Sequence, residues 1–164
     1  MLRPLQLPDH FSGKLWLTSM PGRIETLDEF LGWCREVSVD EIVCLVGGVE
    51  IADKSPHYGD ALRLGTFPIP VEYFPIPDFG IPTDITGSVD LVCRMVARLK
   101  LGRKIVLHCA GGHGRTGMVA TMVLIAGGDS MESALNTVEM AGSAPDTDKQ
   151  KVFIKMVAPR LAGC

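Results

Sequence analysis

The sequence lacks a strong charge imbalance, a long hydrophobic run and any internal repeat. Its 16 Lys and Arg residues against 19 Asp and Glu residues give a formal net charge of -3, so no basic excess drives non-specific binding to nucleic acid. The longest apolar stretch, residues 118–126, is far shorter than the roughly 20 residues that a membrane-spanning helix needs. We therefore expect neither a nucleic-acid partner nor a membrane partner.

Cysteine is sparse and irregularly placed. The five cysteines are odd in number, lie far apart and form no CxxC pair, which argues against a disulfide scaffold and a zinc ribbon. Cys34, Cys44 and Cys93 have apolar neighbours and are interpreted as small buried hydrophobes, whereas Cys164 has no informative context. The first 17 residues contain no uninterrupted apolar segment typical of a signal peptide. The predicted location is a reducing cytoplasm.

The length suits a single domain over residues 1–164, since a second domain would need roughly 100 residues of its own. Hydrophobic periodicity predicts two kinds of element. The expected strands are 14–18, 41–46, 72–75 and 104–108, and the expected helices are 26–37, part of 55–64, 84–100, 115–126, 130–140 and 147–161. Strands alternating with helices predict an α/β domain with a central, mainly parallel β-sheet flanked by helices.

The segment 67–82 contains five prolines, so no regular element can cover all of it. After a short strand we expect a stiff loop from Pro75 to Pro82. This loop carries Asp78, whose carboxyl group the prolines restrict to few positions. Asp84, just after the loop, is a second candidate for a functional carboxyl group, but its position favours capping the next helix.

A glycine-rich turn joins the last predicted strand to a helix, from His108 to Gly117. Three of the five residues between Cys109 and Arg115 are glycine, which lets successive backbone N–H groups point into one small bowl. The following helix adds its positive N-terminal end. Such a bowl suits a tetrahedral oxyanion such as phosphate, sulfate or arsenate.

Cys109 lies at the rim of this bowl, where the same N–H groups favour a thiolate, and a thiolate is a nucleophile at neutral pH. The planar fork of Arg115 can hold two phosphoryl oxygens at once. The Thr116 hydroxyl is placed to donate to the Cys109 sulfur. Asp78 can supply the proton that a departing oxygen needs. The expected backbone donors to the anion are those of Ala110, Gly111, Gly112, His113 and Gly114.

These motifs resemble those of a known family. His108-Cys-x5-Arg115-Thr116-Gly117 is similar to the signature loop of the cysteine-dependent protein tyrosine phosphatases. Asp78-Phe79-Gly80-Ile81-Pro82 resembles the general-acid loop of their compact dual-specificity branch, which includes kinase-associated phosphatase-like and archaeal or bacterial members. The resemblance implies the fold of that branch and a hydrolase of phosphotyrosine, and of phosphoserine or phosphothreonine, in proteins. The phosphate passes through a phosphocysteine, and no metal or organic cofactor is needed.

The resemblance also implies roles for single residues. Cys109 is the nucleophile, Arg115 the phosphate clamp, and Asp78 the general acid and then the base for water. Thr116 assists departure of the thiolate, and His108 supports the loop structurally. Two weaker matches are Gln150, in a TxxQ-like segment whose glutamine places the hydrolytic water, and Glu50, in an acidic loop of some compact members.

Several alternatives stay open. Asp78 is also compatible with a plain turn, Gln150 and Glu50 are compatible with solvated surface, and His113 is typical of either a loop residue or a substrate contact. A metal site made by His108, Cys109 and His113 is disfavoured, because metal would disable the thiolate. The chain could instead act on a lipid, nucleotide or RNA 5′-phosphate, although the signature loop has no lysine for a polyanionic lipid head group. It could also be a non-catalytic phosphopeptide-binding module. Cys44 and Cys93 are possible resolving partners for an oxidised Cys109.

Overall fold

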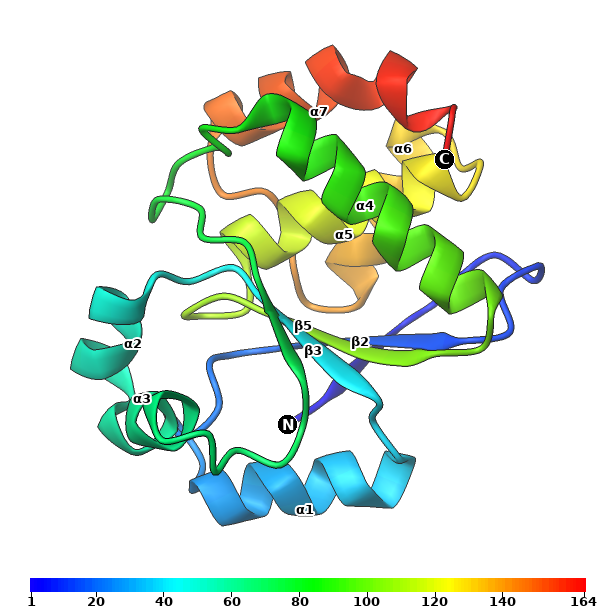
Figure 1. The fold of residues 1–164 in the computed structure, drawn as a ribbon. Helices are drawn as coiled ribbons and strands as arrows, with labels where there is room; N and C mark the ends of the chain where they lie inside the picture. The colour runs from blue at the N-terminus through cyan, green and yellow to red at the C-terminus, as the bar shows by residue number, and fades with distance from the viewer.

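A five-stranded β-sheet with helices on both faces forms the centre of the computed structural model, which describes residues 1–164 (Figure 1). The strands are β1 (Arg3–Leu5), β2 (Lys14–Thr18), β3 (Glu41–Cys44), β4 (Val71–Tyr73) and β5 (Lys104–His108). Their order in the sheet is β1-β2-β5-β3-β4, and only β1 runs antiparallel to its neighbour. The predicted α/β architecture with a mainly parallel sheet is confirmed.

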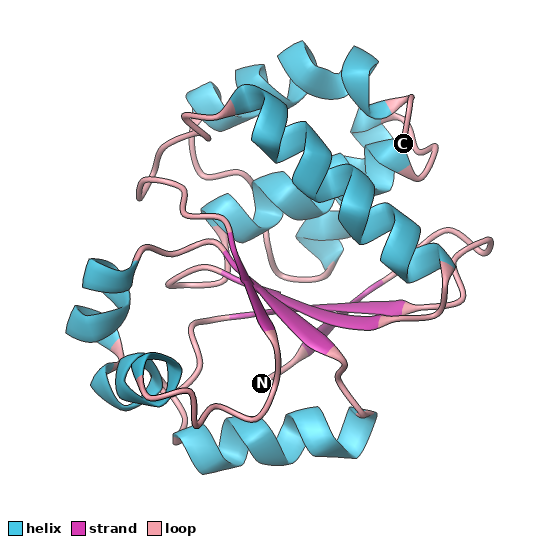
Figure 2. Cartoon of the chain, in the orientation of Figure 1, coloured by secondary structure: helices cyan, strands magenta, loops and turns pink.

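Seven helices cover the sheet: α1 (Leu27–Val37), α2 (Gly48–Lys54), α3 (Pro56–Arg63), α4 (Ile85–Lys100), α5 (Gly114–Ala126), α6 (Met131–Met140) and α7 (Asp148–Leu161). Helices α4 to α7 lie together on one side of the sheet, and α1 lies on the other (Figure 2). The main core of 34 buried residues lies largely between the sheet and α4 to α7, and a smaller cluster of five lies under α1. No helix is both long enough and apolar enough to cross a bilayer.

Local sequence signals account for most helix starts. Thr26 and Glu29 form a reciprocal capping box at α1. Asp84 caps α4 by accepting the Gly87 N–H at 2.8 Å, as its position predicts. Helices α2, α3 and α5 have no side-chain capping bond, and in α5 the N-cap residue is His113. The first N–H groups of α5 are therefore left for another acceptor.

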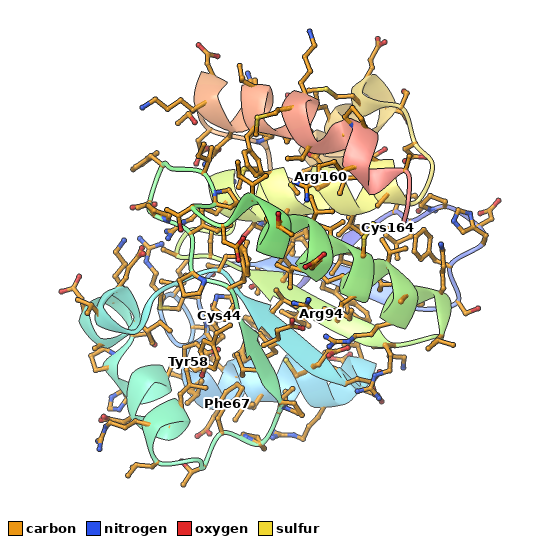
Figure 3. All side chains as sticks on the ribbon, turned by 45° about the horizontal axis from the view of Figure 1, so that its top comes forward. Cys44, Tyr58, Phe67, Arg94, Arg160 and Cys164 are labelled. Carbon is orange, nitrogen blue, oxygen red and sulfur yellow. A yellow bond between two sulfur atoms is a disulfide. The ribbon has the colours of Figure 1, made fainter.

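Two short elements and the bounds of two strands differ from the sequence prediction, since β4 covers Val71–Tyr73 instead of residues 72–75. Strand β1 has only three residues, one of them Pro4, and Pro is tolerated in a strand mainly at an edge, which is where β1 lies. Helix α2 begins at Gly48, directly after Gly47, although glycine disfavours a helix. Strand β3 ends at Cys44 instead of residue 46. The expected helix within 55–64 is α3. Its buried Tyr58 packs edge-on against Phe67, with 5.0 Å between the two ring centroids (Figure 3).

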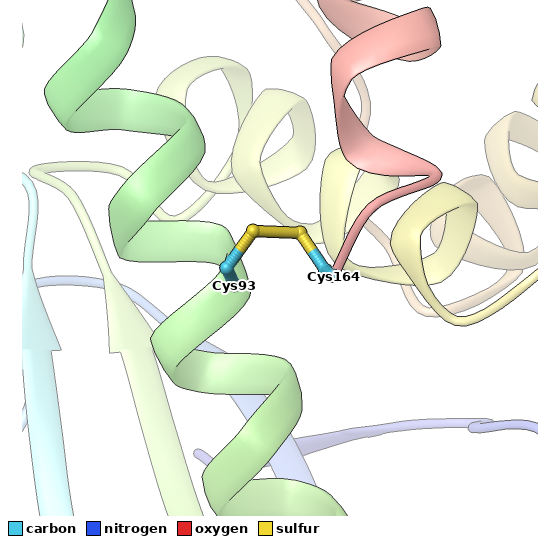
Figure 4. The surroundings of a disulfide bond; sticks show 2 residues. All are labelled: Cys93 and Cys164. Atoms are coloured by element: carbon cyan, nitrogen blue, oxygen red, sulfur yellow. A yellow bond between two sulfur atoms is a disulfide. The ribbon is translucent and has the colours of Figure 1, made fainter.

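The interpretation of Cys93 as a buried free thiol is wrong. Its sulfur, on α4, is bonded to that of Cys164, just beyond the end of α7 (Figure 4). Sequence spacing could not reveal this pair, because 71 positions separate the two residues and only helix packing brings them together. Cys93 is thereby removed as a resolving partner for Cys109, while Cys44 remains free. Disulfides are unusual in a reducing cytoplasm, so the cytoplasmic location stays a prediction.

We expect reduction of this disulfide to lower the free energy of unfolding by up to about 4 kcal/mol, because the cross-link restricts the unfolded chain. Urea titration with and without dithiothreitol measures the change. Cys164→Ser is the control: it has the lower stability already, and reductant leaves it unchanged. Equal sensitivity of both proteins to reductant would contradict the bond.

Candidate active site

The turn between β5 and α5 lies at the carboxyl end of the central strand, where parallel sheets commonly place their sites. Strand β5 is apolar and flanked by β2 and β3, so its end is fixed by backbone pairing on both sides. The turn opens into a cavity of about 490 Å³. The cavity is lined by four residues of the turn (Ala110, Gly111, His113 and Gly114) together with Cys109, Arg115, Arg23, Lys54, Asp78, Phe79 and Asp146.

The Cys109 sulfur is held by the backbone of its own loop. The N–H of Gly112 donates to Cys109 Sγ at 3.2 Å, and only 3% of Cys109 is exposed. Gly112 has a φ of +74°, and a Cβ there would lie 2.4 Å from the Thr18 carbonyl oxygen, so this position requires glycine. The expected proximity of sulfur and loop amides is present.

The carbonyl groups of the loop turn outward. The Ala110 oxygen accepts from Arg23 Nη1 at 2.9 Å and from the Met20 N–H at 3.1 Å. Because the C=O and N–H of a trans peptide point in opposite directions, the Gly111 N–H faces the inside of the bowl. The N–H groups of Ala110, Gly111 and His113 donate to no acceptor in the protein. They are available to an anion, whereas the Gly112 N–H, also among the predicted donors, is taken by the Cys109 sulfur; the anion-binding role stays a prediction.

His108 supports this loop from below. Its Nδ1 lies 3.0 Å from the Cys109 carbonyl oxygen and its Nε2 lies 3.2 Å from the Tyr58 hydroxyl, an arrangement that suits a neutral ring donating from Nδ1. Complete burial lowers the pKa of His108 to about 4, and the positive charge of Arg115 adds to this effect. The predicted structural role therefore fits its geometry.

This burial makes stability depend on pH. The pKa of His108 is about 4 in the folded protein against 6.5 ordinarily, so the unfolded chain binds the proton more tightly. Its contribution to stability is present above pH 6.5 and is lost as pH falls toward 4, with a total of about 3 kcal/mol. Urea titrations between pH 7 and pH 4 should show this loss. His108→Asn should flatten it, whereas exposed His57→Gln should keep it; identical slopes in all three proteins would contradict the assignment.

Arg115 sits in the first turn of α5 with 2% of its side chain exposed. Its fork meets Glu50 in two bonds, Nη1 to Oε2 at 2.8 Å and Nη2 to Oε1 at 2.9 Å. Nη2 also lies 2.8 Å from Asp78 Oδ1, and Nη1 donates to the Ile76 carbonyl at 3.0 Å. Burial disfavours the charged form of Arg115. Its hydrogen bonds to Glu50 and its electrostatic attraction to Cys109, Glu50 and Asp78 nevertheless raise its pKa above the ordinary value.

Glu50 belongs to the site and is not a solvated surface residue. Hydrogen bonds from Arg115 lower the pKa of Glu50 to about 2, with Lys54 adding to the shift against an opposing effect of burial. Lys54 Nζ lies 2.7 Å from Glu50 Oε1 and 3.7 Å from Asp78 Oδ2. Sequence reasoning missed Lys54. Its spacing of four residues from Glu50 is a helical pairing signal, but it becomes readable only once α2 is recognised.

The general-acid candidate lies on a tight turn that faces Arg115. The Gly80 N–H donates to the Pro77 carbonyl at 2.9 Å, which closes a turn with Asp78 and Phe79 at its centre. Asp78 therefore forms a turn and also lines the cavity, and its role as the general acid stays a prediction. Phe79 has a φ of +53°, a conformation that costs a non-glycine residue about 1–2 kcal/mol, and its side chain is 64% exposed beside the cavity.

Two predicted contacts are not found. Gln150 is completely buried and outside the cavity lining; its Nε2 donates to the Gly80 carbonyl at 3.0 Å, and its Oε1 accepts the Asp146 N–H at 2.7 Å. It therefore holds the general-acid loop, and its role toward the hydrolytic water stays a prediction. Thr116 Oγ1 is buried without a hydrogen-bond partner, so the expected donation to the Cys109 sulfur is not made.

The cavity lining contains the predicted residue His113 and two residues that extend the predicted set. His113 is exposed and lines the cavity, which favours its interpretation as a candidate substrate contact. Arg23, from the turn after β2, both lines the cavity and holds the loop. Asp146 was missed, because it comes from the loop before α7 and carries no local motif.

Comparisons with known proteins agree with this geometry. Residues 18–129 match the family model described as Tc-R-P, polymorphic toxin system, DSP-PTPase phosphatase. The uncharacterized protein MJECL20 of Methanocaldococcus jannaschii is 38% identical over 90 residues, which make up 52% of this chain and 58% of that protein. The chain thus spans a little over half the length of this curated relative.

Solved structures show the same fold over nearly the whole chain. A kinase associated phosphatase (KAP), with its catalytic cysteine replaced by serine, matches with a TM-score of 0.83 at 23% identity, covering 100% of this chain and 97% of that chain. Tk-PTP in its active form matches with a TM-score of 0.73 at 25% identity, covering 96% and 97%.

Proposed function

Since the chain belongs to the Tc-R-P family of DSP-PTPase phosphatases and is a cysteine-dependent phosphatase, we propose that it removes phosphate from phosphotyrosine in proteins, with phosphoserine and phosphothreonine as further substrates. One observation carries the chemistry. The Cys109 sulfur, bonded to a loop amide, shares one cavity with the Arg115 fork and the Asp78 carboxyl group. The exposed ring of Phe79 at the same cavity supports an aromatic ester as substrate.

The proposed reaction has two steps. Cys109 Sγ attacks phosphorus, an S–P bond forms, the P–O bond to the leaving group breaks, and Asp78 gives its proton to the departing oxygen. A water oxygen then attacks phosphorus, the S–P bond breaks, and Asp78 takes the proton of that water. Arg115 and the free amides of Ala110, Gly111 and His113 stabilise the equatorial oxygens in both steps, because they are already oriented before the substrate arrives.

A substrate panel tests this proposal. Phosphotyrosine, phosphoserine and phosphothreonine peptides, inositol lipids, nucleotides and a 5′-phosphorylated RNA are compared by kcat/KM. We expect phosphotyrosine peptides to be preferred, and orthovanadate to inhibit. Preference for a lipid, a nucleotide or the RNA would overturn the substrate class. Tight phosphopeptide binding with no turnover of any ester would instead identify a non-catalytic binding module.

A further inference from the structure

We propose that Arg3, on strand β1, is a positioning residue of the active site, which orients the Gly112–His113 peptide so that the His113 N–H faces the bound anion. The inference rests on the proposed phosphatase function and adds a residue that lies outside both the glycine-rich loop and the general-acid loop. It assigns a role to an element, β1, that the sequence pattern did not predict.

The Arg3 guanidinium joins two loops. Nη2 donates to the carbonyl oxygen of Gly112 and lies 3.3 Å from Ser143 Oγ, and Nη1 donates to the carbonyl oxygen of Gly142. Ser143 is buried, and its hydroxyl donates to the same Gly112 oxygen at 2.5 Å. Two donors from outside the glycine-rich loop therefore fix one carbonyl, and one arginine links that loop to the turn after α6.

Fixing this carbonyl fixes the amide on the other side of the peptide. Because the bond between residues 112 and 113 is trans, a Gly112 oxygen turned toward Arg3 leaves the His113 N–H pointing the opposite way, into the bowl. That N–H donates to no acceptor in the protein. Gly112 is also the residue whose own N–H holds the Cys109 sulfur at 3.2 Å, so Arg3 acts on the peptide next to the one that holds the nucleophile.

The charge of Arg3 acts in the same direction. Burial lowers the pKa of Arg3 below its ordinary value, and attraction to Cys109 opposes that shift. The attraction acts in both directions. The positive charge of Arg3 favours the anionic form of the Cys109 sulfur as much as that anion favours the charged guanidinium. A cation bonded to a peptide oxygen also polarises that peptide and makes its N–H a stronger donor. Losing Arg3 should therefore weaken both anion binding and formation of the thiolate.

Three variants test this role: Arg3→Gln removes the charge, Arg3→Lys keeps it, and Arg35→Gln is a matched control at an exposed arginine of α1 without an ion pair. Peptide mass spectrometry follows alkylation of Cys109 by iodoacetamide across pH, and calorimetry measures the affinity for inorganic phosphate. We expect Arg3→Gln to move the alkylation midpoint to higher pH and to weaken phosphate binding about tenfold. In Arg3→Lys the alkylation midpoint should return close to the wild-type pH, whereas the affinity for phosphate should recover little. An ammonium group keeps the charge but cannot donate to both loops with the geometry of the guanidinium.

Ser143→Ala keeps the Arg3 charge and removes the second donor to the Gly112 oxygen. It should weaken phosphate binding without moving the alkylation midpoint, and it serves as the test if Arg3→Gln does not fold. A folded Arg3→Gln protein that matches Arg35→Gln in both measurements would overturn the proposal, as would unchanged phosphate affinity in Ser143→Ala. Neither readout requires turnover. If the variants show these effects while the wild-type protein hydrolyses no ester, the proposed function is refuted and the role of Arg3 stands.

Discussion

Turnover of an aryl phosphate should fall by about 10⁴-fold or more in Cys109→Ser, because a serine hydroxyl in the same bowl does not ionise as a thiol does. The variant should keep its fold and its affinity for phosphate, since the free amides and Arg115 are unchanged. Release of p-nitrophenol measures the first quantity, and calorimetry measures the second.

The matched control is Cys34→Ser, which replaces a buried free cysteine of α1 that lies outside the cavity. It should retain activity at a temperature where both variants are folded. Turnover in Cys109→Ser within tenfold of the control would exclude a phosphocysteine intermediate.

For an ester with a poor leaving group, Asp78→Asn should lower kcat by about 10²–10⁴-fold, the usual contribution of a general acid. An activated aryl phosphate needs no proton on its departing oxygen, so the decrease in kcat for that ester should be much smaller. Phenyl phosphate and p-nitrophenyl phosphate, compared at the same pH, measure the difference.

Asp84→Asn provides the matched control for this variant. Asp84 lies six residues further along the chain and caps α4, and asparagine caps a helix about as well as aspartate. The control should change neither ester appreciably. Equal losses on both esters in Asp78→Asn would remove Asp78 from the role of general acid.

The parts of the fold that could be predicted are those with strong local signals. Strand β5 is a continuous apolar run, and α1 begins at a capping box. The glycines before Arg115 predict the turn between strand and helix. These features depend on neighbouring residues only. The central sheet and the position of Cys109 follow from them.

The parts that failed depend on distant contacts. Helix α2 has seven residues and a glycine start, so the Glu50 and Lys54 pair was not recognised as one helical face of the site. Gln150 was expected to position the hydrolytic water. Its local motif does not show that its side-chain amide donates to the carbonyl oxygen of Gly80, 70 residues earlier. The bond between Cys93 and Cys164 likewise exists only through the packing of α4 and the chain after α7.

The short distance between Asp78 and Arg115 has a consequence for the end of each catalytic cycle. Asp78 Oδ1 lies 2.8 Å from Arg115 Nη2, on the nitrogen that Glu50 also contacts. In the proposed reaction Asp78 is protonated when phosphate is formed, and once it loses that proton its carboxylate can take the place of the departing phosphate on Arg115. The proposal therefore makes Asp78 an intramolecular competitor of the product, which the next ester must displace from the guanidinium.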